Sequence, residues 1–518
     1  MDEINFSLEI EFNVEVKFLD NKLFGKLIFS KETPAHLELI VNDMFFALGK
    51  ECDDIIECEH GNNKYTLMGC SKYGTKIFPK FIIMNKPDDL ISFNEIEVSI
   101  SQLNVIFHDG YFSNDFENDK FISCKNQSNF EVEVNDSDTI KSISDYWLYW
   151  SEISHDNDMI TKFTQRHIIS IKSKKNLSYG EVIKEIRHVC LLFSLLSLIQ
   201  IHVNFAWVVY NNRRCPIYFP SIKPTSSKKI EWYHSIINLK DINSDMWSKI
   251  INNSYSNSKF QKTWERFYGM LSYNSYWEYE FLGFMSILDY YLKLKYKFKN
   301  HKENTFKNKY IAQLSDISEF IKNFISLPLD KFQRLLNIRN GVAHSDPDKL
   351  DILNDISALM ILKNRLIILL NYLALKDLGI EDIDYANSAM KSFNPTLLNA
   401  VTKKKWLAKI IGNTSAIILP SDNFRQLKHF SKSARDLIII SKKSKEFTFD
   451  EQLSLKLNNE IYTMKGKYSN ICDYIDNELS HFINGEYISE YIHTLHIHTP
   501  NEDDFIEATS VYILNKID

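Results

Sequence analysis

Three side chains in the segment LLNIRNGVAH have the chemistry needed to break a phosphodiester bond. The imidazole of His344 titrates near neutral pH and can transfer protons. The guanidinium of Arg339 carries a permanent charge in a planar fork that matches phosphate oxygens, and the amide of Asn340 can orient either group. Because RNA supplies its own nucleophile, the 2′-hydroxyl beside each phosphate, these residues could act on RNA without a nucleophile from the protein.

The spacing of these residues fits one helical stretch. On a helix, Asn340 and His344 are four residues apart and share a face, and Arg339 lies about 100° to one side. An alternative is that Arg339 makes a surface ion pair and His344 stabilises the helix C-terminus. A pattern of six residues also occurs by chance in long proteins. The residues alone therefore leave both interpretations open.

The motif lies in a region with helical periodicity, from residue 256 to residue 380. Apolar residues recur at intervals of three and four, for example from Phe281 to Leu292. Pro328 and Pro347 stand on either side of the motif, at positions where prolines are common outside helix ends. This pattern predicts an all-α bundle with the motif near the end of one helix.

Strands are expected before this bundle. Between Phe6 and Phe18 apolar residues alternate strictly with polar ones, which is the period of a half-buried strand. Short strand-like segments follow to about residue 140. We therefore expect an antiparallel β domain over residues 1–145.

Residues 146–255 predict a mixed α/β connector, with a helix at 179–198 and a strand at 203–210. The apolar stretch from Cys190 to Tyr210 is long enough to cross a membrane. Its character changes from Leu-rich to β-branched and aromatic, and polar residues enter its second half, so a buried helix followed by a strand fits better. The N-terminus lacks the pattern of a signal peptide. We expect no membrane span and a cytoplasmic location.

The last segment, residues 381–518, has the pattern of a mixed α/β extension, and its role is unknown. The expected fold class is therefore α+β multidomain: a β domain, a mixed connector, a helical bundle and this extension.

The net charge of −6 over 518 residues means that any contact with nucleic acid must come from a local basic patch. One candidate patch follows the first helix of the predicted bundle. Lysines can track phosphates there, and an interleaved aromatic can stack on an unpaired base. The alternative is a solvated helix end and loop. The residues of this patch are Lys293, Lys295, Tyr296, Lys297, Lys299 and Lys302.

Potential metal ligands are present but sparse. The seven cysteines have no CxxC spacing, which argues against both a disulfide framework and a zinc ribbon. Three cysteines and a histidine lie between Cys52 and Cys70, where strands commonly bury lone cysteines. His496 and His498 would share a strand face, and we expect surface histidines because no companion ligand is near. We predict no metal and no cofactor.

The segment around Arg339 resembles the R-N-x-x-x-H signature of HEPN domains, in their ApeA-like form. The helix EYEFLGFMSILDYYLKL resembles the family helix that precedes the catalytic one, with Asp289 where Glu is more usual. The segment LIILLNYLALKDLGI resembles the closing helix of the family. The segments GKLIF, KYTLMGC and FHDGYF resemble the ApeA N-terminal domain. The resemblance covers about residues 5–380, and residues 381–518 have no counterpart in it.

The resemblance implies a metal-independent endoribonuclease that acts in abortive defence against phage, with tRNA anticodon loops as the RNA that is cut. Arg339 would stabilise the phosphorane, His344 would be the general acid and base, Asn340 would orient, and Asp289 would hold the arginine or the histidine. The implied partners are RNA, a second copy bound through the HEPN bundle, and a phage-derived trigger.

Two other functions fit the same residues. The bundle could be a non-catalytic sensor and dimerisation scaffold that binds RNA or a phage protein. The chain could also be a toxin whose inhibitor is encoded nearby.

Overall fold

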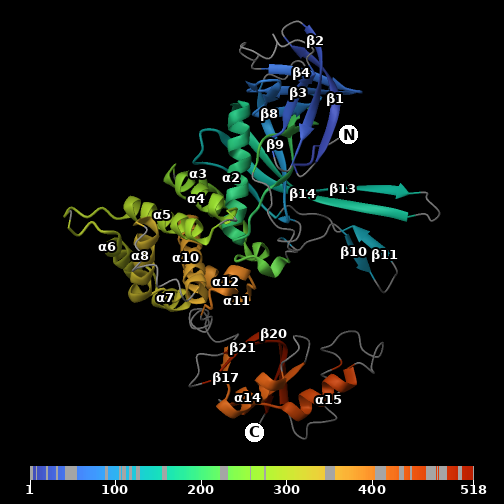
Figure 1. The fold of residues 1–518 in the computed structure, drawn as a ribbon. Coiled ribbons are helices and arrows are strands. Elements are labelled where there is room, and N and C mark those ends of the chain that lie inside the picture. The colour runs from blue at the N-terminus through green and yellow to red at the C-terminus, as the bar shows by residue number, and fades with distance from the viewer. Residues whose placement is uncertain are drawn as a thin grey trace.

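The computed structural model describes most of the chain (Figure 1). The parts outside the described residues are 1–3, 7–8, 19–20, 31–32, 41–54, 88–91, 104–106, 108–111, 116–119, 124–128, 155–159, 222–230, 257, 274–275, 301, 345–355, 403–415, 431–436, 444–445, 462–473, 475–476, 478–486, 500–504 and 517–518. Cys52 and Pro347, which the sequence singles out, therefore lie outside the described residues.

One large sheet fills the N-terminal part, and the neighbouring strands described in it pair antiparallel. The antiparallel β domain that the alternation predicts is confirmed. In spatial order the strands are β12 (Glu131–Glu133), β13 (Ile140–Ser154), β14 (Ile160–Leu177), β9 (Phe93–Ile100), β15 (Val203–Tyr210), β16 (Arg213–Tyr218), β8 (Phe81–Met84), β5 (Asn63–Met68), β4 (Ile55–His60), β1 (Ile10–Phe18), β2 (Asn21–Phe29), β3 (His36–Ile40), β7 (Lys76–Phe78) and β6 (Ser71–Tyr73). A separate hairpin joins β10 (Phe112–Asp115) to β11 (Lys120–Ser123).

The alternating pattern near the N-terminus becomes β1. Val14 and Val16 of β1 are buried, whereas Lys17 is exposed and forms an ion pair with Glu59 of the neighbouring strand β4. The strand begins at Ile10, so the first part of the predicted segment precedes it.

The strands of the expected connector belong to this same sheet. β14 and β15 pair with opposite edges of β9, and the expected division after residue 145 falls inside β13. The helix that follows β14 is α2 (Tyr179–Ser197). Ser178 begins it with a capping box: its side chain accepts from the Glu181 N–H, and the Glu181 carboxylate accepts from the Ser178 N–H. The apolar stretch from Cys190 to Tyr210 is thus a buried helix that runs into a strand, as its change of character predicts.

Helices follow, as the periodicity predicts, and the all-α bundle is confirmed. The first two, α3 and α4, come after two short 3-10 turns. Pro328 stands directly before α8, and its carbonyl accepts the first helical hydrogen bond from Phe332 at 2.9 Å. The helices are α3 (Ser244–Ser256), α4 (Ser258–Leu271), α5 (Trp277–Lys295), α6 (Phe306–Asp316), α7 (Glu319–Ile325), α8 (Leu329–His344), α10 (Ile356–Asp377), α11 (Asp382–Lys391) and α12 (Pro395–Asn399).

One helix within the described residues has the length and apolar character of a membrane span, the stretch Ser357–Asp377 of α10. Most of that stretch is buried inside the protein. It packs against α5, α2, α7, α11 and α12, so it is the central helix of the bundle.

Sheet and bundle share one continuous hydrophobic core, which extends from Ile4 to Ala400. Helix α2 lies between the two in Figure 1 and contacts β9, β14, α4 and α10. Buried amides reinforce the junction: Asn371 on α10 donates to the Leu195 carbonyl at 2.7 Å, and Asn394 donates to the carbonyls of Ser197 and Leu198. Since such donors are costly to leave unpaired in a core, these bonds fix where α2 ends against the bundle.

The C-terminal part has its own mixed sheet and two cores of its own, as the pattern predicts. Helix α14 supplies Phe424 and Leu427 to one core, and α15 supplies Leu453 and Leu457 to the other. In chain order the elements are β17 (Ala416–Ile418), α14 (Ser421–Phe430), β18 (Ile438–Lys443), β19 (Glu446–Phe449), α15 (Glu451–Ile461), β20 (Tyr487–His498) and β21 (Phe505–Lys516).

The expectation that His496 is a surface residue is wrong. Its side chain is buried, with 2% of its surface exposed. The reason is that β20 is an inner strand, paired with β17 and β21, in a sheet that lies between two hydrophobic cores. Among the residues that the structure describes, no three His, Cys, Asp or Glu side chains form a group that could hold a metal ion.

Candidate functional site

Helix α5 places Asp289 in a nearly buried position. The helix packs through a stripe that includes Phe281, Met285, Leu288 and Leu292, and Asp289 follows Leu288 at the edge of this stripe. Its side chain is only 12% exposed. A carboxylate so placed needs charged or hydrogen-bonding partners, because burial without them is costly.

Helix α8 places Arg339 opposite Asp289. Phe332, Leu335 and Ile338 anchor α8 in the core. Arg339 follows Ile338 and emerges at the side of α8 that faces α5, with which α8 is in contact. Its side chain is 36% exposed, so the guanidinium is held by the protein and also reached by solvent.

Two cations share one oxygen of Asp289. Its Oδ2 lies 2.9 Å from the Lys293 Nζ and 3.7 Å from the Arg339 Nη2. Its Oδ1 is buried and has no hydrogen-bond partner among the residues that the structure describes. Two positive charges against one carboxylate leave this surface with a net positive charge, which favours a phosphate.

An aromatic ring supports the guanidinium from a third helix. The Arg339 Cζ lies 5.6 Å from the centroid of the Phe306 ring, within the range of a cation–π contact. Phe306 is the first residue of α6, which Thr305 caps by accepting from the Asn308 N–H at 3.2 Å. The ring is fixed in turn by an edge contact with Phe332 at 5.2 Å. Arg339 is therefore held by residues of both α5 and α6.

The other two motif residues lie further along α8. Asn340 is exposed, and His344 is the last residue of the helix. The side chain of His344 lies outside the part of the chain that the structure describes.

The basic patch divides into a bound part and an exposed part. Lys295 binds Asp316 at 3.1 Å and Gln313 at 3.1 Å. The hydroxyl of Tyr296 donates to the same two residues, and burial together with Asp316 raises the pKa of Tyr296. Both side chains are thus tied to α6, beside the α5 face that carries Lys293.

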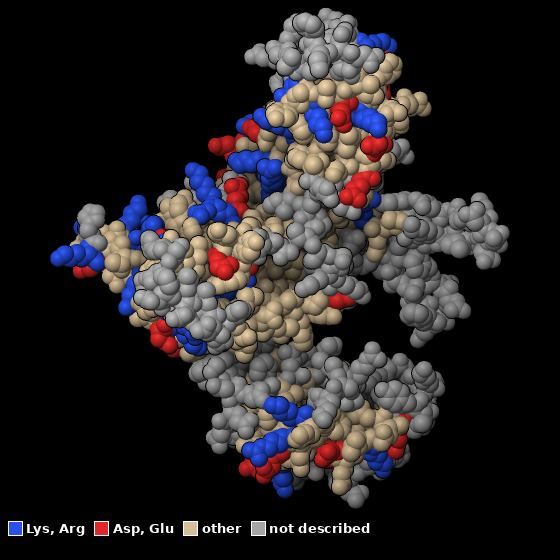
Figure 2. Space-filling model, viewed as in Figure 1, with Lys and Arg blue, Asp and Glu red and all other residues tan. Residues whose placement is uncertain are grey.

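Lys297, Lys299 and Lys302 are exposed in the connection between α5 and α6. This connection projects from the bundle at the left of Figure 1, and blue side chains cover its tip in Figure 2. These three lysines are the members of the patch that could follow an RNA backbone without breaking a protein contact.

Sequence reasoning missed two parts of this site. The pairing of Lys293 with Asp289 could have been found, because the two residues are four apart on one helix. The position of Phe306 carries no such signal, since α6 and α8 are brought together by packing alone.

Two family descriptions match the chain. The description "ApeA N-terminal domain 1" matches residues 11–253, and "Apea-like HEPN" matches residues 283–383. The second match contains both Asp289 and the segment from Arg339 to His344. The same comparisons found no matching curated protein and no matching solved structure.

Proposed function

This chain is an ApeA-like HEPN protein, and on that premise we propose that it is a metal-independent endoribonuclease. HEPN domains are generally ribonucleases, and the residues that they need are present here as Arg339, Asn340 and His344. The observation that carries the proposal is the position of Arg339, held at 3.7 Å by Asp289 and supported by the ring of Phe306 while more than a third of its side chain faces solvent.

The proposed step needs only groups of the protein and of the RNA. The 2′-hydroxyl oxygen attacks the adjacent phosphorus, and the bond from phosphorus to the 5′-oxygen breaks. His344 takes the proton from the 2′-hydroxyl as general base and gives a proton to the leaving 5′-oxygen as general acid, so the protons balance. Arg339 balances the charge that grows on the phosphorane oxygens. The products are a 2′,3′-cyclic phosphate and a 5′-hydroxyl.

We further propose that two copies pair through the HEPN bundle, within residues 256–380, so that two motifs share one cleft. The motif lies at the C-terminal end of α8, where Asn340 is exposed, which suits a site completed by a second copy. We propose anti-phage defence as the role and tRNA as the substrate. Free activity would harm the host, so the N-terminal sheet and residues 381–518 are proposed to restrain the site until infection.

The test is cleavage of total tRNA by the purified chain in EDTA, with and without extract from phage-infected cells. The matched variants are Arg339→Ala and His344→Ala. The control is Asn337→Ala, an exposed position on the same helix whose side chain accepts a hydrogen bond from Gln333 at 3.2 Å. End-group analysis of the fragments identifies the 2′,3′-cyclic phosphate.

We expect cleavage by the wild type and by Asn337→Ala, and cleavage slowed by about 100-fold or more in the two motif variants. Loss of cleavage on chelation would contradict the metal-independent mechanism. Full activity of His344→Ala would show that this histidine does not transfer the protons. A wild type that binds RNA but never cuts it, with or without infected-cell extract, would favour the non-catalytic scaffold.

A further inference from the structure

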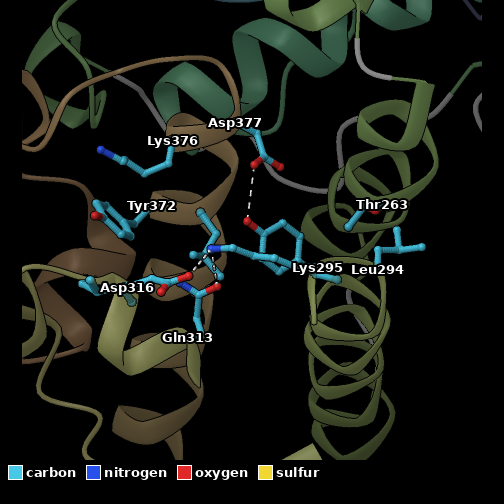
Figure 3. A pocket seen from close by; sticks show the side chains of 11 residues that line it. Thr263, Leu294, Lys295, Gln313, Asp316, Tyr372, Lys376 and Asp377 are labelled. Carbon is cyan, nitrogen blue, oxygen red and sulfur yellow. Dashed lines mark hydrogen bonds and ion pairs between the residues drawn. The ribbon is translucent and has the colours of Figure 1, made fainter. Parts of the chain in front are cut away.

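A cavity of about 400 Å³ lies between α4, α5, α6 and α10 (Figure 3). It is separate from the Asp289 site. Tyr291 and Lys295 face it from α5, and these residues are about 200° around the helix from Asp289 and Lys293. A volume of this size is typical of sites for small molecules.

Asp377 places a carboxyl group at one end of the cavity, where two neutral donors hydrogen-bond to it. Its carboxylate accepts from the Trp264 Nε1 at 3.1 Å and from the Tyr291 hydroxyl at 3.3 Å, and both donors are neutral. Among the residues that the structure describes, no Lys, Arg or His forms an ion pair with it. Burial raises the pKa of Asp377, and the two hydrogen bonds and the charge of Lys295 act against that rise.

The two lysines that line the cavity are already paired. Lys295 reaches from α5 to Asp316 and Gln313, at the end of the cavity away from Asp377 (Figure 3). Lys376 extends away from Asp377 and binds Asp382 at 3.0 Å and Glu381 at 3.6 Å. An anionic ligand would therefore meet two lysines that are already paired and the carboxyl group of Asp377, which would repel it.

The remaining wall suits an alkyl chain with a positive end. Leu294, Ile317 and Leu373 provide aliphatic surface, and the rings of Tyr291 and Tyr372 provide aromatic surface. Aliphatic side chains pack well against methylene groups, and aromatic rings attract ammonium groups.

We propose that this cavity binds a primary alkylammonium compound, with its ammonium group against Asp377 and its methylene chain along the aliphatic wall. Lys295 and Tyr296 already hold the Asp316 carboxylate, so Asp377 is the group that the ammonium binds. A neutral heterocycle would fill the space but leave Asp377 without a counter-charge.

Isothermal titration of the full chain tests this proposal. The ligands are putrescine and cadaverine, with butylamine as a monoamine, succinate as an anion and uridine as a neutral heterocycle. We expect saturable binding of one amine per chain at submillimolar concentration for putrescine, cadaverine and butylamine, and none of succinate or uridine.

Two variants test the site itself. Asp377→Asn keeps the shape of the side chain and removes its charge, and we expect at least a tenfold loss of diamine affinity. Leu294→Trp fills the cavity from its half-exposed rim and should abolish binding even if Asp377→Asn fails to fold. Asp245→Asn, an exposed position on α3, is the control for loss of one surface charge and should bind as the wild type does.

The proposal is overturned if no diamine binds the wild type, or if succinate or uridine binds in its place. Diamine binding that is unchanged in Asp377→Asn or in Leu294→Trp would equally overturn it, because the ammonium would then sit elsewhere.

Discussion

The change Asp289→Asn should weaken catalysis about fivefold, because Asp289 acts through Arg339. The variant keeps the size of the side chain and removes the charge that faces the guanidinium at 3.7 Å. Over that distance, Coulomb's law gives about 1 kcal/mol in a water-like medium and about 4 kcal/mol at an effective dielectric constant of about 20.

The lower figure applies for two structural reasons. The Arg339 side chain is 36% exposed, so solvent screens the pair. The Lys293 Nζ also lies closer to the same oxygen, at 2.9 Å, and therefore neutralises more of its charge. About 1 kcal/mol lost from the transition state corresponds to a rate lower by roughly fivefold.

A double-mutant cycle separates positioning from stability. We expect Arg339→Ala to lower kcat by about 100-fold or more, as for removal of a group that stabilises a transition state. In that background, Asp289→Asn should cost nothing further. Initial rates of tRNA cleavage give kcat and KM, and thermal melting checks each fold. If Asp289→Asn still costs fivefold in the absence of Arg339, or changes KM alone, then Asp289 does not act by holding the guanidinium.

Two further predictions concern pH and salt. Burial lowers the pKa of His188, which lies 2.9 Å from the Ser254 hydroxyl, to about 4, whereas the unfolded chain binds this proton near pH 6.5. The free energy of unfolding should therefore fall as the pH is lowered through this window, by up to about 1.4 kcal/mol per unit, and His188→Gln should lack that part of the fall in urea titrations at pH 7 and 4.5. A parallel pH dependence in the variant would contradict the assignment. Replacing Lys297, Lys299 and Lys302 by Gln should reduce the slope of log K against log salt for single-stranded RNA by about 2, and an unchanged slope would show that these lysines do not meet phosphates.

Local sequence signals predicted the elements that carry the motif. Leucine and phenylalanine spacing placed the helices, Pro328 marked the start of α8, and strand 203–210 matches β15 at both ends. These features follow from the period of one element and from its end residues, which neighbouring parts of the chain do not alter.

Domain organisation was harder to predict than the elements. The segments of β14 and β15 were assigned to a connector over residues 146–255, and both strands pair with β9 in the N-terminal sheet. The partner of a strand depends on which distant segment pairs with its free edge. Alternation within the strand indicates its buried face and does not identify that partner.

The sequence by itself determined that Arg339, Asn340 and His344 lie on one helical stretch, because their spacing and the helix end are local properties. Only the tertiary structure decided that Asp289 and Phe306 meet Arg339, that Asp316 holds Lys295, and that Asp377 faces a cavity. Those contacts join four helices whose side chains come together through a shared core, and the packing of that core depends on the whole chain at once.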